Sequence, residues 1–203
     1  MIQAIFFDFG GVLGLWDRAY VEAFEAEYGL PEGGVLKALY GTPGWRAVEI
    51  GRLPVDGWLV EVEAAMAAAA RKPVPSAHSV WSRLWNDIDR DVIDLARRLR
   101  SRYRVGVLSN TTTMLEQQVL APNGILDMWD VIINSARIGI AKPDAGIYAA
   151  AAEAVGVAPG ECVHIDDLEN NVLGAEAAGF AAVHHTGDFA ALEASLRALG
   201  VAW

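Results

Sequence analysis

The sequence predicts an α/β fold in which helices cover a parallel β-sheet and an all-helical segment is inserted after the first strand. Two patterns carry this prediction. From Arg90 onward, short apolar runs bounded by turn residues alternate with helical stretches, as in parallel strands joined by helices. Between Gly14 and about Asp87 only helical patterning is present, interrupted by glycine and proline breaks.

The first strand is the apolar run 4–7, which ends at Asp8. Four apolar residues followed by a carboxylate and a glycine turn are typical of a buried parallel strand. The segment between Ile133 and Lys142 is expected to be a loop. The elements expected after the inserted segment are a helix at Asp91–Arg102, strands at Val105–Leu108 and Val131–Ile133, a helix at Gly146–Val155, a strand at Val163–Ile165, a helix ending at Ala178, a strand at Ala181–His184 and a helix at Phe189–Leu199.

In the helical segment, Asp17 is expected to cap a helix at Arg18–Tyr28. Most tryptophans of this segment are expected to pack inside a small bundle, with one or two lining a pocket that faces Asp8. The predicted architecture is a Rossmann-like parallel sheet sandwich, formed by residues 1–13 and 88–203, with a helical cap at residues 14–87. The five tryptophans of the segment are Trp16, Trp45, Trp58, Trp81 and Trp85.

Composition limits the function. The 203 residues suit one core with a sizeable insertion. A net charge of −10 disfavours nucleic acid and anionic membranes as partners, and an anionic substrate then requires local positive charge or a metal. The single Cys162 excludes a disulfide framework within the chain. Without a leader pattern or a long apolar helix, a cytoplasmic location is expected.

Polar residues follow the predicted strands where each strand ends: Asp8, Ser109, the Asp166–Asp167 pair and, beyond a loop, Lys142. Because the carboxyl ends of parallel strands share one edge of a sheet, these groups are expected to meet there. They suit phosphoryl transfer through an aspartyl intermediate, with Asp8 attacking phosphorus. Two anions approach each other only if a divalent cation intervenes, and hard carboxylate oxygens suit Mg²⁺.

At these positions the chain resembles the haloacid dehalogenase superfamily, in the subgroup whose helical cap follows the first motif. The resemblance implies that Asp8 is the nucleophile and that Asp8, the Gly10 carbonyl and Asp167 hold Mg²⁺. Asp166 ligates directly or through water, and Asn171 orients the acidic loop. The substrate-binding candidates are Gly10, Gly11, Ser109, Asn110 and Lys142. The segments that carry the resemblance are Phe7-Asp8-Phe9-Gly10-Gly11-Val12-Leu13, Leu108-Ser109-Asn110, Lys142-Pro143-Asp144 and Ile165-Asp166-Asp167-Leu168-Glu169-Asn170-Asn171.

One position departs from the pattern of the family's phosphatases. Gly10 stands where they usually carry a second Asp, the general acid and base. Such a group contributes about 10²–10⁴-fold to the rate. The chain is similar in this respect to sugar-1-phosphate phosphatases, which implies a leaving group that needs little protonation, such as an anomeric or acyl oxygen.

Other interpretations stay open at this stage. The chain could be a metal-independent 2-haloacid dehalogenase, although the acidic pair argues against this, or a catalytically silent binding module. Ser109 and Asn110 could begin a turn, and Asp166 and Asp167 could cap a helix. We predict a Mg²⁺-dependent phosphatase that hydrolyses a small phosphorylated metabolite, a sugar phosphate among the candidates, as a monomer or homodimer.

Overall fold

The computed structural model of the chain describes residues 1–85 and 87–203. Its strands are β1 (Ala4–Phe7), β2 (Gly14–Leu15), β3 (Asp87–Ile88), β4 (Arg104–Ser109), β5 (Val131–Asn134), β6 (Cys162–Asp166) and β7 (Ala181–His184). Its α-helices are α1 (Arg18–Tyr28), α2 (Gly34–Tyr40), α3 (Pro43–Val48), α4 (Val55–Ala69), α5 (Ala77–Leu84), α6 (Arg90–Leu99), α7 (Ser135–Ile138), α8 (Ala145–Val155), α9 (Glu169–Ala177) and α10 (Phe189–Ala198). A π-helical turn, η1 (Leu115–Leu120), and two 3₁₀ turns, η2 (Leu126–Met128) and η3 (Pro159–Glu161), complete the elements.

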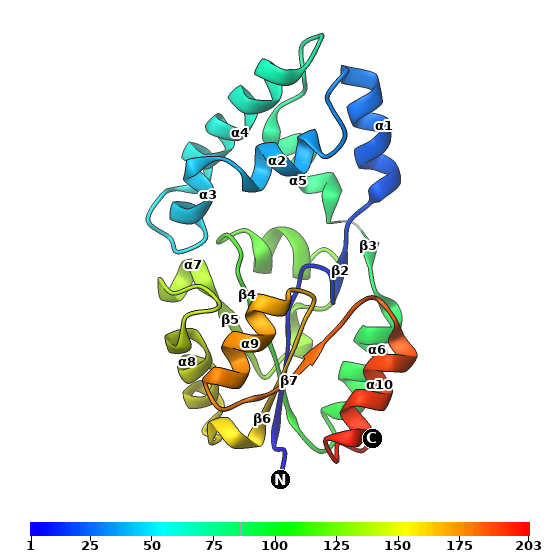
Figure 1. Cartoon of the computed structure of the whole chain (residues 1–203), viewed down its shortest axis with the longest axis vertical. Helices are drawn as coiled ribbons and strands as arrows, with labels where there is room; N and C mark the ends of the chain where they lie inside the picture. Colours follow the sequence, from blue (N-terminus) through cyan, green and yellow to red (C-terminus); the bar gives the residue numbers. More distant parts are fainter. Residues whose placement is uncertain (86) are drawn as a thin grey trace.

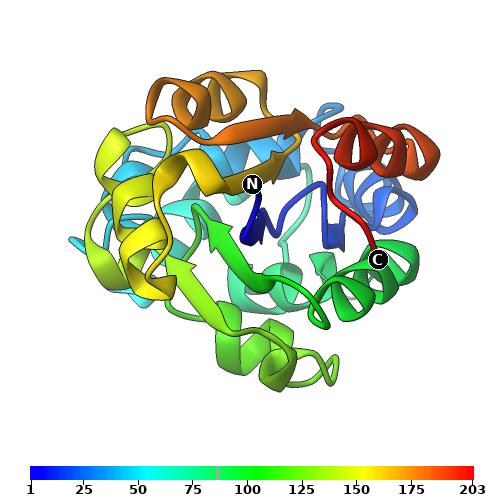
Figure 2. The same cartoon turned by 90° about the horizontal axis from the view of Figure 1, so that it is seen from below.

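Five strands form one parallel sheet in the order β5-β4-β1-β6-β7 (Figures 1 and 2). β1 is central because it pairs with β4 on one side and with β6 on the other. The helices α6 and α10 contribute to the core cluster on one face of the sheet, and α8 and α9 contribute to the cluster on the opposite face. The observed architecture confirms the predicted α/β fold.

The composition of β1 explains its central place. Ile5 and Phe7 belong to the cluster that contains α6, whereas Ala4 and Phe6 belong to the cluster that contains α8. All four side chains are buried. A strand that is apolar on both faces is stable only in the middle of a sheet covered on both sides. Asp8 therefore leaves the middle of the sheet at its carboxyl edge.

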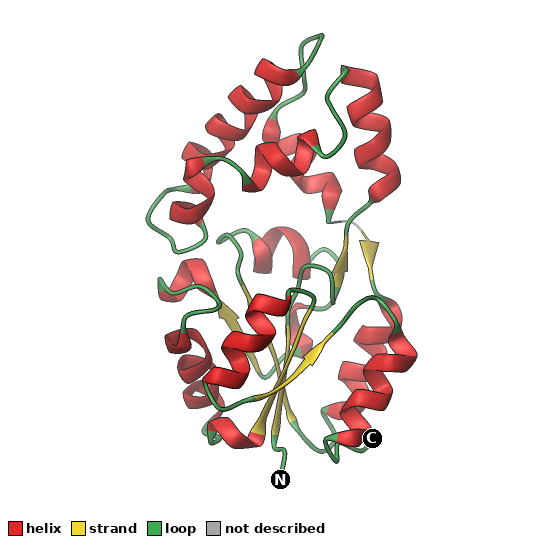
Figure 3. Ribbon diagram, viewed as in Figure 1, coloured by secondary structure: helices red, strands yellow, loops and turns green. Residues whose placement is uncertain are grey.

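The helices α1 to α5 lie beyond that edge (Figure 3). The predicted helix Arg18–Tyr28 is confirmed, with the Asp17 carboxylate accepting a hydrogen bond from the Tyr20 N–H. Trp58 is completely buried among these helices and donates its indole N–H to the Leu39 carbonyl at 3.0 Å. None of the helices in the described residues is long and apolar enough to cross a membrane.

Two sequence-based expectations were wrong. The segment from Gly14 to Asp87 is not purely helical, because its two ends form the antiparallel ribbon β2–β3. Two-residue strands are too short to produce a period-2 pattern. The expected loop before Lys142 contains α7, capped by the Asn134 side chain and ended by Gly139 in the left-handed region. The division of the chain into core and cap at residues 13/14 and 87/88 stays a proposal.

Candidate active site

Asp8 lies one residue beyond β1, and backbone contacts fix its position. Its N–H donates to the Ile165 carbonyl at 2.8 Å, which continues the pairing of β1 with β6. Its Oδ1 accepts a hydrogen bond from the Phe9 N–H at 2.7 Å. The residue is only 7% exposed. The carboxylate is therefore held in one orientation in a nearly dry site.

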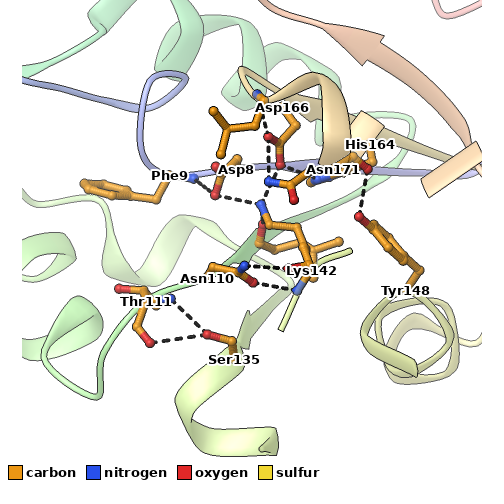
Figure 4. A network of polar contacts seen from close by, with 12 residues as sticks. Asp8, Phe9, Asn110, Thr111, Ser135, Lys142, Tyr148, His164, Asp166 and Asn171 are labelled. Carbon is orange, nitrogen blue, oxygen red and sulfur yellow. Dashed lines mark hydrogen bonds and ion pairs between the residues drawn. The ribbon is translucent and has the colours of Figure 1, made fainter. Parts of the chain in front are cut away.

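Lys142 provides the positive charge next to Asp8 (Figure 4). Its ammonium lies 3.0 Å from Asp8 Oδ1 and 2.6 Å from Asp166 Oδ2, and it donates to the Leu108 carbonyl at 3.0 Å. The Lys142 side chain is completely buried. Four segments that are distant in the sequence are thus joined by one ammonium group at the carboxyl edge of the sheet.

Asn110 fixes the loop that carries Lys142. Its Oδ1 accepts the Lys142 N–H at 2.7 Å, and its Nδ2 donates to the Lys142 carbonyl at 2.9 Å. Next to it, the Ser135 hydroxyl accepts the Thr111 N–H at 2.9 Å. Asn110 also lines the cavity described below. Its contact with substrate stays a prediction, whereas its hold on the Lys142 backbone is observed.

Both carboxylate oxygens of Asp166 are engaged by the protein. Oδ2 receives Lys142 and contacts His164 Nε2 at 2.9 Å. Oδ1 accepts the Leu168 N–H at 2.9 Å and the Asn171 side-chain amide at 3.0 Å. This last contact is the one expected of a residue that orients the acidic loop. With four partners, Asp166 is placed to hold Lys142, and direct metal ligation by it stays a prediction.

Asp8, Asp166 and Asp167 each offer a carboxylate oxygen, and these oxygens lie within 4.8 Å of one another. Asp167 is half-buried and lines the same cavity as Asp8. Hard, anionic oxygen donors gathered in this way fit Mg²⁺ better than a softer metal. The residues present are therefore compatible with the metal that the sequence predicts.

Burial and charge shift the ionisation of these groups. Burial raises the pKa of Asp8 to about 7 in the metal-free protein, although Lys142 opposes the shift. Burial also raises the pKa of Asp167, and the charge of Asp166 acts in the same direction. For Asp166, burial is outweighed by Lys142 and His164, which hold its pKa well below the ordinary range. Burial would lower the pKa of Lys142, but the two carboxylates raise it.

The remaining predicted site residues lie around Asp8. Ser109 is 3% exposed and lines the cavity, and its side chain lowers the pKa of the Asp8 carboxyl. Gly10 also lines the cavity. The Gly11 N–H donates to the Gly14 carbonyl at 2.9 Å, so its contact with a phosphoryl group stays a prediction.

A cavity of about 500 Å³ opens next to Asp8 and extends to residues of α2, α3 and α5. The expectation that one or two tryptophans line it was too low, because four do: Trp16, Trp45, Trp81 and Trp85. Trp85 packs against Gly10, where an added Cβ would lie 3.3 Å from its Cη2. The ring of Trp85 therefore occupies the space next to the position where the family's phosphatases usually carry their acid.

Sequence reasoning did not assign several residues that line this cavity, among them Tyr40, Arg46 and Glu49. Burial raises the pKa of the Tyr40 hydroxyl well above its usual range, and the charges of Asp8 and Asp167 add to the shift. Glu49 follows the last residue of α3 and is 3% exposed. A tyrosine at the end of a helix and a glutamate after one carry no signal for a cavity, because such positions are usually solvated or structural.

Comparison with known proteins identifies the family. A sequence model described as "haloacid dehalogenase-like hydrolase" matches residues 2–179. The chain belongs to this family of hydrolases. The D-ribitol-5-phosphate phosphatase of Bacteroides thetaiotaomicron is 27% identical over 89% of this chain and 90% of its own length. Phosphatase MT3486 of Mycobacterium tuberculosis is 39% identical, but the match spans 46% of this chain and 42% of that relative.

Solved structures of haloacid dehalogenase-like enzymes share the fold. A predicted HAD-like family hydrolase from Porphyromonas gingivalis has a TM-score of 0.77 and 25% identity, covering 98% of both chains. A HAD family enzyme from B. thetaiotaomicron, in complex with magnesium and inorganic phosphate, has a TM-score of 0.74 and 23% identity, covering 93% of this chain and 96% of that one. The predicted family and enzyme class are thus confirmed.

Proposed function

We propose that this hydrolase is a Mg²⁺-dependent phosphatase that hydrolyses a small phosphorylated metabolite through a phosphoaspartate at Asp8. The observation that carries the proposal is the meeting of Asp8, Lys142 and Asp167 beside one cavity. The relative named for D-ribitol 5-phosphate supports a phosphorylated metabolite as the substrate class.

In the first step, a carboxylate oxygen of Asp8 forms a bond to phosphorus while the bond from phosphorus to the leaving oxygen breaks. Lys142, 3.0 Å from Asp8 Oδ1, stabilises the negative charge at the reacting centre. The Ser109 hydroxyl, which lines the same cavity as Asp8, would donate to a phosphoryl oxygen. Mg²⁺ held by Asp8, Asp167 and the Gly10 carbonyl would neutralise the repulsion between the carboxylate and the phosphoryl oxygens.

In the second step, water attacks phosphorus and the bond between phosphorus and Asp8 breaks. Inorganic phosphate leaves, and the Asp8 carboxylate is restored. The Phe9 N–H keeps Oδ1 in place through both steps, because this backbone donor at 2.7 Å does not depend on the substrate. The cap helices above the sheet edge exclude bulk water from the reacting centre.

The glycine at position 10 bears on which leaving groups the enzyme prefers. With Trp85 beside that glycine, no side chain at position 10 protonates the departing oxygen. Good leaving groups, such as anomeric or acyl oxygens, are therefore the preferred class. Initial rates on glucose 1-phosphate and acetyl phosphate are expected to exceed those on an alkyl phosphate such as glycerol 1-phosphate by tenfold or more. Equal rates would contradict the leaving-group proposal.

The nucleophile is tested by Asp8→Asn. Phosphate release from acetyl phosphate in 5–10 mM MgCl₂ should fall to background, because an amide does not attack phosphorus at a comparable rate. Asp56→Asn, a matched change at an exposed cap carboxylate, should behave as the wild type. Full activity of Asp8→Asn would exclude Asp8 as the nucleophile, and metal-independent turnover of 2-chloropropionate by the wild type would favour a dehalogenase.

A further inference from the structure

The wall of the cavity built by α2, α3 and Trp16 has its own chemistry, distinct from that of the sheet edge. Its exposed ring surface comes from Trp16, Tyr40 and Trp45, all half-buried. These rings pack against one another, because Tyr40 makes edge contacts with Trp16 and Trp45 at centroid distances of 5.6 and 4.7 Å. Rigid aromatic walls with few polar groups are typical of sites that bind the organic part of a small ligand.

Glu49 adds a carboxylate to this aromatic wall. It is 3% exposed and lines the cavity. Its Oε1 accepts a hydrogen bond from Arg46 Nη1 at 3.1 Å. Its Oε2 accepts no hydrogen bond from the described residues. This oxygen is also not completely buried, so a ligand in the cavity can reach it. This oxygen is available to a donor on a ligand.

The charges of the cavity are unevenly distributed. Of the described residues that line it, only Lys142 and Arg46 are cationic. Lys142 is shared by Asp8 and Asp166, and Arg46 is paired with Glu49 while its own side chain is 81% exposed. A second anionic group on a substrate would therefore meet Glu49 in a poorly solvated space without an uncommitted cation to balance it. Like charges in such a setting repel strongly.

We propose that Glu49 and the rings of Trp16, Tyr40 and Trp45 form a leaving-group subsite for hydroxyl-bearing groups without a second anion. Glu49 is the specificity-determining residue of this subsite: its Oε2 accepts a hydrogen bond from a substrate hydroxyl, and its charge rejects bisphosphates and phosphorylated acids. The inference rests on the proposed phosphatase function, and it adds the class of substrate that the site accepts.

The test compares a matched pair of substrates that differ by one phosphate. Initial rates of phosphate release from glucose 1-phosphate and glucose 1,6-bisphosphate give two values of kcat/KM. The wild type should favour the monophosphate at least 30-fold. Glu49→Gln should reduce this preference tenfold or more, with kcat/KM for the bisphosphate rising, because the repulsion is removed and Arg46 becomes available to the second phosphate.

A rise in activity on the bisphosphate separates this effect from damage to the fold. The control Glu22→Gln alters an exposed glutamate of the same cap and should keep the wild-type preference. A wild type that hydrolyses the bisphosphate as well as the monophosphate overturns the proposal. An unchanged preference in Glu49→Gln also overturns it.

Different results would refute the proposed phosphatase function and the proposed subsite. Absence of phosphate release from acetyl phosphate would defeat the phosphatase proposal alone. The subsite is then decided by binding, because its tryptophans report on ligands through their fluorescence. Quenching by glucose at concentrations where glucose 6-phosphate has no effect supports the subsite, and equal or stronger quenching by glucose 6-phosphate overturns it.

Discussion

Two opposing effects set the pKa of Asp8: its burial raises the pKa, and the charge of Lys142 lowers it. Burial moves the pKa of Asp8 to about 7 in the metal-free protein, so near pH 6 this carboxyl group is mostly protonated. A metal binds the carboxylate and must displace that proton. If Asp8 is a Mg²⁺ ligand, as proposed, the proton competes with the ion most strongly below pH 7 and progressively less above it.

The expected outcome is an apparent Mg²⁺ affinity about tenfold weaker at pH 6 than at pH 8, since about 90% of Asp8 is protonated at one unit below its pKa. Calorimetric titration in two buffers of different ionisation enthalpy should detect close to one proton released per ion at pH 6. It should detect almost none at pH 8.5. Equal affinities at both pH values would show that Asp8 is not a ligand or is already ionised.

Gly11 is a second residue whose identity the site requires. Its φ of +72° lies in the left-handed region, and a Cβ at this position would collide with the Asp167 carboxylate. Gly11→Ala should lower the free energy of unfolding by about 1–3 kcal/mol through backbone strain. It should also weaken Mg²⁺ binding, because Asp167 must move.

The matched control for Gly11→Ala is Gly124→Ala. Gly124 has a φ of +69°, but an added Cβ would meet nothing within 4 Å. This change should cost comparable stability in urea unfolding and leave Mg²⁺ affinity unaltered. If both variants bind Mg²⁺ as the wild type does, the contact between Gly11 and Asp167 has no role in metal binding.

Single residues differ in how far the sequence predicts them. Asp8, Ser109 and Asp166–Asp167 could be placed because each directly follows an apolar strand, and parallel strands end at one edge. Lys142 was placed there from the same edge argument, although a loop and α7 separate it from β5. Tyr40 and Glu49 could not be found, because their place at the cavity depends on how the cap helices sit over the sheet.

At the scale of elements, the loop after β1 and the end of α5 meet through Gly10 and Trp85. Trp85 also packs against Trp16 and Phe9 in tilted ring pairs, at centroid distances of 4.2 and 5.3 Å. A side chain at position 10 must displace part of this cluster. The packing around Trp85 therefore affects whether an acidic side chain fits at position 10.

This link predicts a coupling between positions 10 and 85. Gly10→Asp should destabilise the protein by about 1–3 kcal/mol, as overpacking does. Combined with Trp85→Leu, it should cost less than the sum of the single changes by about 0.5–3 kcal/mol. Urea unfolding of the four proteins measures this cycle.

A second cycle with Gly124→Ala, at a turn that does not touch Trp85, serves as the additive reference. Additivity in both cycles would show that Trp85 does not restrict position 10. Coupling confined to the Gly10 cycle would explain in physical terms why the acid cannot simply be restored by one substitution.

The sequence predicts elements well where one physical signal is strong. The strands β1, β4, β5, β6 and β7 are apolar runs, and the predicted spans differ from the observed ones by at most one residue at each end. The ribbon β2–β3 was missed because each strand has two residues. The π-helical turn η1 was missed because its apolar positions do not reveal its hydrogen-bond pattern.

At the scale of the whole molecule, the chain carries a net charge of −10. Part of this charge lies at one edge of the sheet, where oxygens of three carboxylates lie within 4.8 Å of one another. Repulsion among them opposes the compact state, and a cation that binds only the folded protein relieves it. Binding at 100 times Kd stabilises a protein by about 2.7 kcal/mol. For a chain of this size each kcal/mol shifts the Tm by roughly 2–4 °C.

Saturating Mg²⁺ should therefore raise the Tm by about 5–11 °C in a thermal melt at pH 8. KCl at matched ionic strength should give a smaller rise, because general screening does not place a cation between the carboxylates. Asp167→Asn should lose the difference between the two salts while keeping the fold. If MgCl₂ and KCl act equally on the wild type, the acidic cluster is balanced by Lys142 alone. The proposed attack of Asp8 on a phosphoryl group would then require another source of positive charge.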